Sequence, residues 1–174
     1  MAVLSSAHLF DQVEKLIVPP PAGPPRQVDV RRAISAAYYG VFHHVLTKAA
    51  DEFVGVVNRA TRNYAVVYRS ISHTALSKMC QDIQKSTLPS KLAKVAPIDG
   101  FGTDIVAFAE FFPELQDKRH SADYDPFIRV KTADAKLALS SARSAVSHFD
   151  RAEPTQRKAF LTILVFQYGA SRSN

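Results

Sequence analysis

The segment from residue 29 to residue 53 constrains the fold more than any other part of the chain, because it reads as one long helix with two unlike faces. At about 100° per residue, its apolar side chains form one stripe: Ile34, Tyr38, Val41, Phe42, Val45 and Ala49. A polar row follows the flank of that stripe: Arg32, Ser35, Tyr39 and His43. Such a row can receive a phosphate, or it can be the polar edge of a buried helix whose members satisfy one another.

The N-terminal part of the chain reads as a helix and a connector. Ser5 or Ser6 can cap the helix, which ends before residues 19–25. Five of those seven residues are proline, which excludes a helix and favours an extended spacer.

The rest of the chain also shows helical spacing of apolar residues. It predicts helices over about 61–85, 104–119 and 132–149, with Pro113 as a candidate kink. Between them, residues 86–100 read as a loop that packs through Leu92, Val95 and Ile98, and residues 123–126 as a turn. The apolar run 160–168 suits either a helix closed by Gly169 or a strand.

These elements predict an all-α fold, a bundle of five or six helices in a single domain. A chain of 174 residues can bury one sizeable core. We divide it into an N-terminal helix (1–18), a proline-rich connector (19–27), a core (28–150) and an apolar C-terminal segment (154–169).

Composition narrows the class of protein. The single cysteine, Cys80, excludes an intrachain disulfide framework and fits a reducing compartment. We expect a cytoplasmic protein without membrane contact, because the chain shows neither a secretory signal nor a long apolar span. The net charge of +6 is spread along the chain without a long basic run, so it permits a polyanionic partner without requiring one.

Two short motifs resemble the HEPN superfamily (higher eukaryotes and prokaryotes nucleotide-binding). In the long helix, an arginine-rich start precedes a Ser-x-x-Tyr-Tyr-x-x-Phe-His pattern at residues 35–43. Further along, residues 119–125 resemble the Arg-x-x-Ala-Asp-Tyr-Asp segment of one branch of that superfamily. The resemblance covers residues 28–150 and implies a HEPN-like up-and-down helical bundle.

The resemblance also implies a chemistry. Many HEPN proteins are metal-independent ribonucleases that act as dimers and carry an arginine and a following histidine with four to six residues between them. Arg143 and His148 match that spacing and are the predicted catalytic pair, with histidine as general acid–base and arginine stabilising charge on the phosphate. On a helix they lie roughly 140° apart, so they can meet a substrate only in a dimer cleft. Arg69 and His73 are one residue short of the motif but would share one helix face.

A second predicted site combines the two motifs and would bind RNA or a nucleotide through Arg32, Tyr39, His43, Arg119, His120, Asp123 and Tyr124. The alternative is a scaffold in which Asp123 pairs with Arg32 or Arg119 and the tyrosines fill the bundle. No metal-binding motif is present among the histidines, and we expect no cofactor.

The sequence therefore predicts a HEPN-like protein that engages RNA or a nucleotide, as an endoribonuclease of the toxin or defence type. It would form a homodimer and, as in the family, work beside a nucleotidyltransferase-type partner. The alternative functions are a non-catalytic accessory subunit that binds a protein or a nucleotide, and a purely structural helical dimer.

Overall fold

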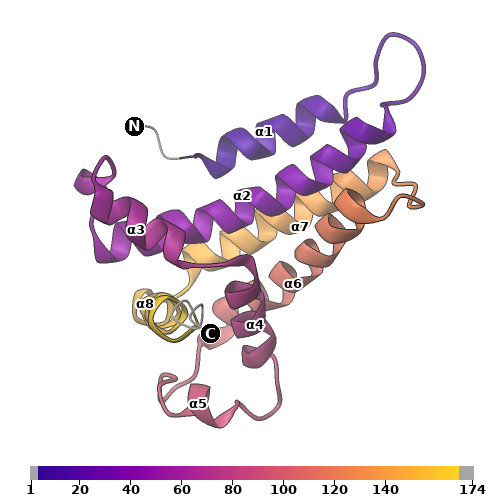
Figure 1. Ribbon diagram of the computed structural model, residues 1–174. Coiled ribbons are helices and arrows are strands. Elements are labelled where there is room, and N and C mark those ends of the chain that lie inside the picture. Colours follow the sequence, from indigo (N-terminus) through magenta and orange to yellow (C-terminus); the bar gives the residue numbers. More distant parts are fainter. Residues whose placement is uncertain (1–3, 169–174) are drawn as a thin grey trace.

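The computed structural model describes residues 4–168, and its regular elements are all helical (Figure 1). In chain order they are α1 (Ser6–Leu16), α2 (Gln27–Phe53), the 3₁₀ turn η1 (Val56–Asn58), α3 (Arg62–Ser70), α4 (His73–Ile83), α5 (Ser90–Ala93), α6 (Gly102–Tyr124), α7 (Thr132–Arg151), α8 (Pro154–Ile163) and the π-helical turn η2 (Leu164–Tyr168). The predicted all-α bundle is confirmed. The described part contains eight α-helices because one predicted helix is divided and a short one was not predicted.

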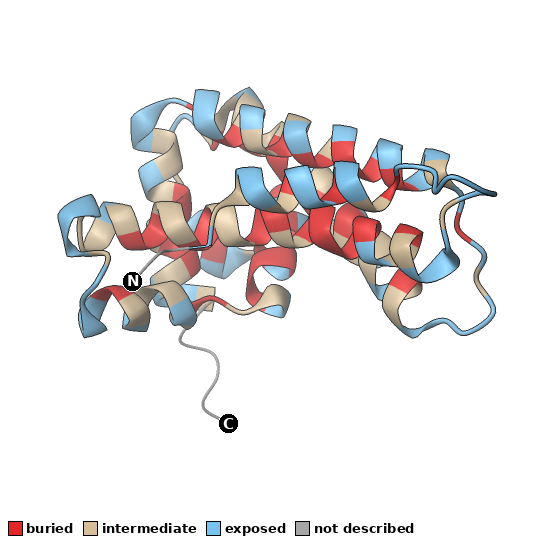
Figure 2. Ribbon diagram, turned by 90° about the horizontal axis from the view of Figure 1, so that it is seen from above, coloured by how far each residue is buried: buried red, intermediate tan, exposed pale blue. Residues whose placement is uncertain are grey.

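The long helix predicted over residues 29–53 is α2, and it forms the centre of the bundle. Helices α1, α3, α6 and α7 all pack against it, and Figure 2 shows the buried residues gathered on the facing sides of these helices. Of the 27 residues of α2, 14 are buried, so burial extends beyond the predicted apolar stripe. The additional buried residues include small ones, such as Ala33, Ala37 and Gly40, which allow neighbouring helices to approach closely.

Helix α1 packs on α2 through a close contact between an aromatic ring and a glycine. Phe10 is buried, and its ring occupies the space where a side chain at Gly40 would lie. A Cβ atom added to Gly40 would overlap the ring carbon Cε1 and lie only 2.9 Å from Cδ1. Glycine at this position therefore permits the observed approach of the two helices.

The predicted helix over 61–85 is wrong in its continuity, because it is two helices. The chain is extended at Ile71 (φ −94°, ψ 126°), and the Ser72 hydroxyl accepts a hydrogen bond from the Ala75 N–H as the N-cap of α4. A serine side chain that satisfies the first orphan N–H groups of a helix favours a new start there. Ile71 itself is buried, which preserves the apolar spacing across the break.

The segment 86–100 contains the short helix α5, where the sequence predicted only a loop. Leu92 is buried, as predicted for a packed segment. Val95 and Ile98 are exposed, so their predicted packing is wrong.

Helix α6 extends five residues beyond its predicted end at Arg119 and passes through Pro113. The predicted turn at 123–126 is therefore wrong in its first half, since Asp123 and Tyr124 are helical. This extension matters for the candidate site, because it places Asp123 one helical turn after Arg119 on the same face.

The C-terminal part agrees with the predicted helices. Helix α7 buries the predicted small residues against the bundle: Ala135, Ala138, Ala142 and Ala145. The run 160–168 is helical, with Pro154 in the first turn of α8, and the predicted closure at Gly169 lies outside the described residues.

Candidate functional site

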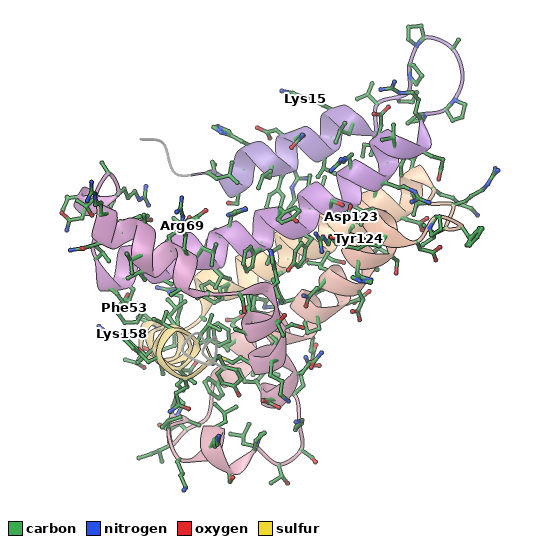
Figure 3. The ribbon with its side chains drawn as sticks, viewed as in Figure 1. Lys15, Phe53, Arg69, Asp123, Tyr124 and Lys158 are labelled. Atoms are coloured by element: carbon green, nitrogen blue, oxygen red, sulfur yellow. The ribbon has the colours of Figure 1, made fainter. Side chains whose placement is uncertain are left out.

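The candidate site centres on the guanidinium of Arg119, near the C-terminal end of α6. Its Nε atom lies 2.8 Å from Asp123 Oδ2, and its Nη2 donates a hydrogen bond of 2.8 Å to the Tyr39 hydroxyl. The second carboxylate oxygen of Asp123 accepts a hydrogen bond from the Ser35 hydroxyl. The two motifs found in the sequence thus meet across the contact between α2 and α6, where Figure 3 shows Asp123 and Tyr124 beside α2.

Three tyrosine rings surround the same guanidinium. The Arg119 Cζ atom lies 6.0 Å from the ring centroid of Tyr38, 5.4 Å from that of Tyr39 and 5.3 Å from that of Tyr124. Cation–π contacts of this length favour a fixed position for the guanidinium. Only 17% of the Arg119 side chain and 20% of the Asp123 side chain are accessible, so this pair acts mainly as the internal support of the site.

A row of aromatic rings continues from this cluster towards α3 and α4. Tyr39 stacks on His43, whose Nδ1 lies 2.7 Å from the Tyr68 hydroxyl, and burial lowers the pKa of His43. On the inner side, the Tyr38 hydroxyl lies 2.6 Å from Nδ1 of His73. His43 is therefore near the cluster but points to α3 and does not reach Arg119 directly.

The structure adds Arg31, which was not among the predicted site residues, to the site. Its guanidinium donates to the carbonyl of Ala122 at 3.3 Å and to that of Ile128, which fixes the end of α6 and the following loop to α2. Its neighbour Arg32, the predicted site residue, is exposed on α2. The spacing of Arg31 in the sequence indicates this position, because Arg31 precedes Ser35 by four residues and so continues the polar row of the long helix.

The outer surface of the site carries exposed rings. Tyr124 is 62% exposed, and its ring centroid lies 5.0 Å from that of the exposed His120. Three residues further on, Phe127 is 91% exposed, and Arg129 follows it on the same loop. We call the four residues His120, Tyr124, Phe127 and Arg129 the exposed aromatic edge. Arg31 on α2 binds the carbonyl of Ile128 in the loop, and Arg119 on α6 binds the Tyr39 hydroxyl of α2 and contacts the ring of Tyr124, so both arginines fix this edge against α2.

Arg143 and His148 are not brought together. Arg143 donates a hydrogen bond of 2.8 Å to Glu14 on α1, whereas Nδ1 of His148 lies 2.7 Å from Asp104 at the start of α6. Arg151 also contacts this carboxylate at 2.9 Å. The two residues thus lie on different flanks of α7, as their spacing predicts, and their catalytic role stays a prediction.

The pair Arg69 and His73 does not share a helix face, because α3 ends at Ser70 and α4 begins at His73. Arg69 lies on α3 (Figure 3), whereas His73 is the first residue of α4. His73 instead packs its ring on Phe42, with centroids 3.8 Å apart. The helical argument for this pair is therefore wrong.

A further row of polar groups joins three helices. Nε2 of His44 on α2 lies 2.9 Å from Asp150 on α7, and its Nδ1 lies 3.5 Å from the Ser6 hydroxyl on α1. Lys48 also contacts Asp150 at 2.9 Å. Partial burial favours the neutral acid, but the hydrogen bonds from His44 and Lys48 outweigh it and lower the pKa of Asp150 to about 2. The contacts tie α1 and α7 to α2.

The described residues give little support to a metal site, to a cysteine nucleophile or to a membrane-spanning helix. Within residues 4–168, no three His, Cys, Asp or Glu side chains come close enough together to hold a metal ion. Cys80 is fully buried, and burial raises the pKa of its thiol, which disfavours a thiolate nucleophile. No helix in this part of the chain has both the length and the apolar character needed to cross a bilayer.

Comparison with known proteins adds no relative. No protein-family model, no curated protein and no solved structure matches the chain. The fold is that of an all-α helical bundle.

Proposed function

We propose that this protein binds single-stranded RNA or a nucleotide through the exposed aromatic edge at the end of α6. The observation that carries the proposal is the pair of exposed rings, Tyr124 and Phe127, held at a fixed place by the buried contacts of Arg119 and Arg31. Unpaired bases stack on such rings without regard to sequence.

Cations accompany the rings. Arg129 follows Phe127 on the same loop, and Arg32 is adjacent to Arg31, which binds this loop directly. Both arginines are exposed and suit phosphate contacts, while Arg119 supports the edge from inside. A positive chain with a net charge of +6 assists the approach of a polyanion.

We further propose that the protein cleaves the RNA that it binds, and this part of the proposal rests on the resemblance to the HEPN superfamily. His148 has one ring nitrogen against Asp104, an arrangement that orients a histidine for general acid–base catalysis. Arg143 lies on another flank of α7, so cleavage requires a second copy of the chain to complete the site. A non-catalytic accessory subunit remains the alternative within the same fold.

RNA binding can be tested by fluorescence anisotropy with a labelled single-stranded RNA. We expect Tyr124→Ala and Phe127→Ala to weaken binding by about fivefold to 150-fold each, because stacking of one base contributes about 1–3 kcal/mol. Phe166→Ala is the matched control, since Phe166 is 63% exposed and lies in η2, outside this edge. Affinity should also fall steeply with salt. Equal affinities of all three variants and the original protein would refute the binding site.

Cleavage is tested separately, with total RNA in the presence of EDTA. We expect the Arg143→Ala/His148→Ala protein to keep its affinity for RNA and to lose cleavage. Intact RNA with the original protein, together with the expected binding results, would exclude the ribonuclease and favour the accessory subunit.

A further inference from the structure

A pocket of about 930 Å³ lies between α4, α5 and η2. Within residues 4–168, none of the lining residues belongs to the Arg119 cluster or to the exposed aromatic edge. Its volume is within the range of small-molecule sites, about 300–1,000 Å³. The residues that give it chemical character are Lys78, Asp82, Lys85, Lys91, Leu92 and Tyr168.

The wall formed by α4 contains a buried carboxylate that holds two lysines. Asp82 is 4% exposed, and its Oδ1 accepts hydrogen bonds from Lys78 at 2.9 Å and from Lys85 at 2.6 Å. Its Oδ2 accepts a hydrogen bond of 2.9 Å from the Tyr168 hydroxyl. Burial alone would raise the pKa of Asp82, but these donors outweigh that effect and lower it, so the carboxylate stays ionised.

The two lysine ammonium groups carry more positive charge and more hydrogen-bond donors than the Asp82 carboxylate can pair. The side chains of Lys78 and Lys85 remain 54% and 49% exposed, and each ammonium has three donors, of which Asp82 engages one. Lys91, on α5, also lines the pocket. Three lysines and one carboxylate leave a net charge of +2, and Asp82 is the one acidic residue among the described residues that line the pocket.

The remaining lining suits an organic ligand more than a bare ion. Thr74 and Ser90 contribute hydroxyls that can bind phosphate oxygens, and Ala75, Pro89 and Leu92 contribute apolar surface. We propose that this pocket binds a small organic phosphate ester, with its phosphate between the lysines and its organic part against the apolar wall.

The proposal is tested by isothermal titration calorimetry with two phosphate esters, ribose 5-phosphate and AMP, beside ribose, adenosine and inorganic phosphate. We expect at least one ester to bind tenfold more tightly than both inorganic phosphate and its own uncharged counterpart. Lys91→Gln should weaken that ester at least fivefold. Lys94→Gln is the matched control, because Lys94 is exposed just after α5 and does not line the pocket.

Any one of three results would overturn the proposal. The first is that neither ester binds, and the second is that inorganic phosphate binds as tightly as the esters. The third is that the two lysine variants weaken binding equally. Thermal melting of both variants checks that they are folded. The RNA affinity of Lys91→Gln should equal that of the original protein, so a parallel loss of RNA binding would place Lys91 in the RNA site and would also contradict the separate pocket.

Discussion

The contact between Phe10 and Gly40 allows a prediction whose sign depends on the background. In most helix interiors, replacing glycine with alanine stabilises a protein by about 1 kcal/mol. At Gly40 the new methyl group would overlap the buried ring of Phe10. Overpacking of this kind costs about 1–3 kcal/mol. Because the added Cβ atom would overlap a ring carbon, the cost here belongs to the upper part of that range, about 2–3 kcal/mol. After the gain of about 1 kcal/mol in helix propensity, we expect Gly40→Ala to lower the free energy of unfolding by about 1–2 kcal/mol.

Removing the ring should reverse that effect. Phe10→Ala alone should cost about 3 kcal/mol, because it leaves a cavity between α1 and α2. In the Phe10→Ala background the methyl group at residue 40 meets no ring, so Gly40→Ala should stabilise the protein by about 1 kcal/mol. The coupling energy between the two positions is then about 2–3 kcal/mol, which is large for a pair of side chains.

Urea unfolding followed by far-ultraviolet circular dichroism measures all four proteins. Ser140→Ala, at an exposed position on α7, is the control, and its small effect should be the same with and without Phe10. A stabilising Gly40→Ala in the original background, with no coupling to Phe10→Ala, would show that the ring does not lie over Gly40 and would refute the proposed packing of α1.

Two further predictions concern the polar contacts of the bundle. The carboxylate of Asp150, whose pKa is lowered to about 2, stabilises the fold above the pKa of the unfolded chain, about 3.9, and this contribution is lost as the pH falls towards 2. Because Asp150 is 41% exposed, we expect Asp150→Asn to cost no more than about 1 kcal/mol at pH 7 and nothing near pH 2, as measured by urea unfolding across that range. A pH-independent difference would contradict the ion pairs with His44 and Lys48. Ser72→Ala should cost about 1 kcal/mol in the same unfolding assay, because the N-cap bond to Ala75 is lost, whereas Ser72→Asp should retain most of the stability.

Hydrophobic spacing was enough to predict the main helices, because a helix buries one face and that face recurs along the sequence. It failed where the spacing continued although the helix did not. Ile71 is buried in an extended conformation, so the apolar period crosses the gap between α3 and α4 unbroken. The capping serine at residue 72 was the available signal.

The predicted end of α6 was wrong for the opposite reason, because the helix continues past the expected boundary. The acidic residues at 123 and 125 suggested a turn, but Asp123 continues the helix because it pairs with Arg119 one turn earlier. The helix ends with Tyr124, immediately before Asp125, and a residue that precedes a proline avoids the helical conformation. The proline at 126 therefore predicts this boundary better than the acidic residues do.

The site shows the same division between local and distant information. The i, i+4 spacing within α2 predicted which of its side chains share a face, and the candidate site drawn from the two motifs included residues that do meet across α2 and α6. The partners supplied by other elements could not be predicted from spacing. Tyr68 and His73 reach the cluster through the packing of α3 and α4, and the loop that carries Phe127 is bound by Arg31 at the carbonyl of Ile128.

The central position of α2 has a consequence for synthesis on the ribosome. Its neighbours α1 and α3 are close in sequence, whereas α6 and α7, which cover the rest of its surface, are complete only at residue 151. At about 5–20 residues per second, a surface that includes Tyr38 and Phe42 waits roughly 5–20 s for its cover. The nascent chain is therefore most vulnerable to aggregation, and most in need of a chaperone, between the emergence of α2 and that of α7.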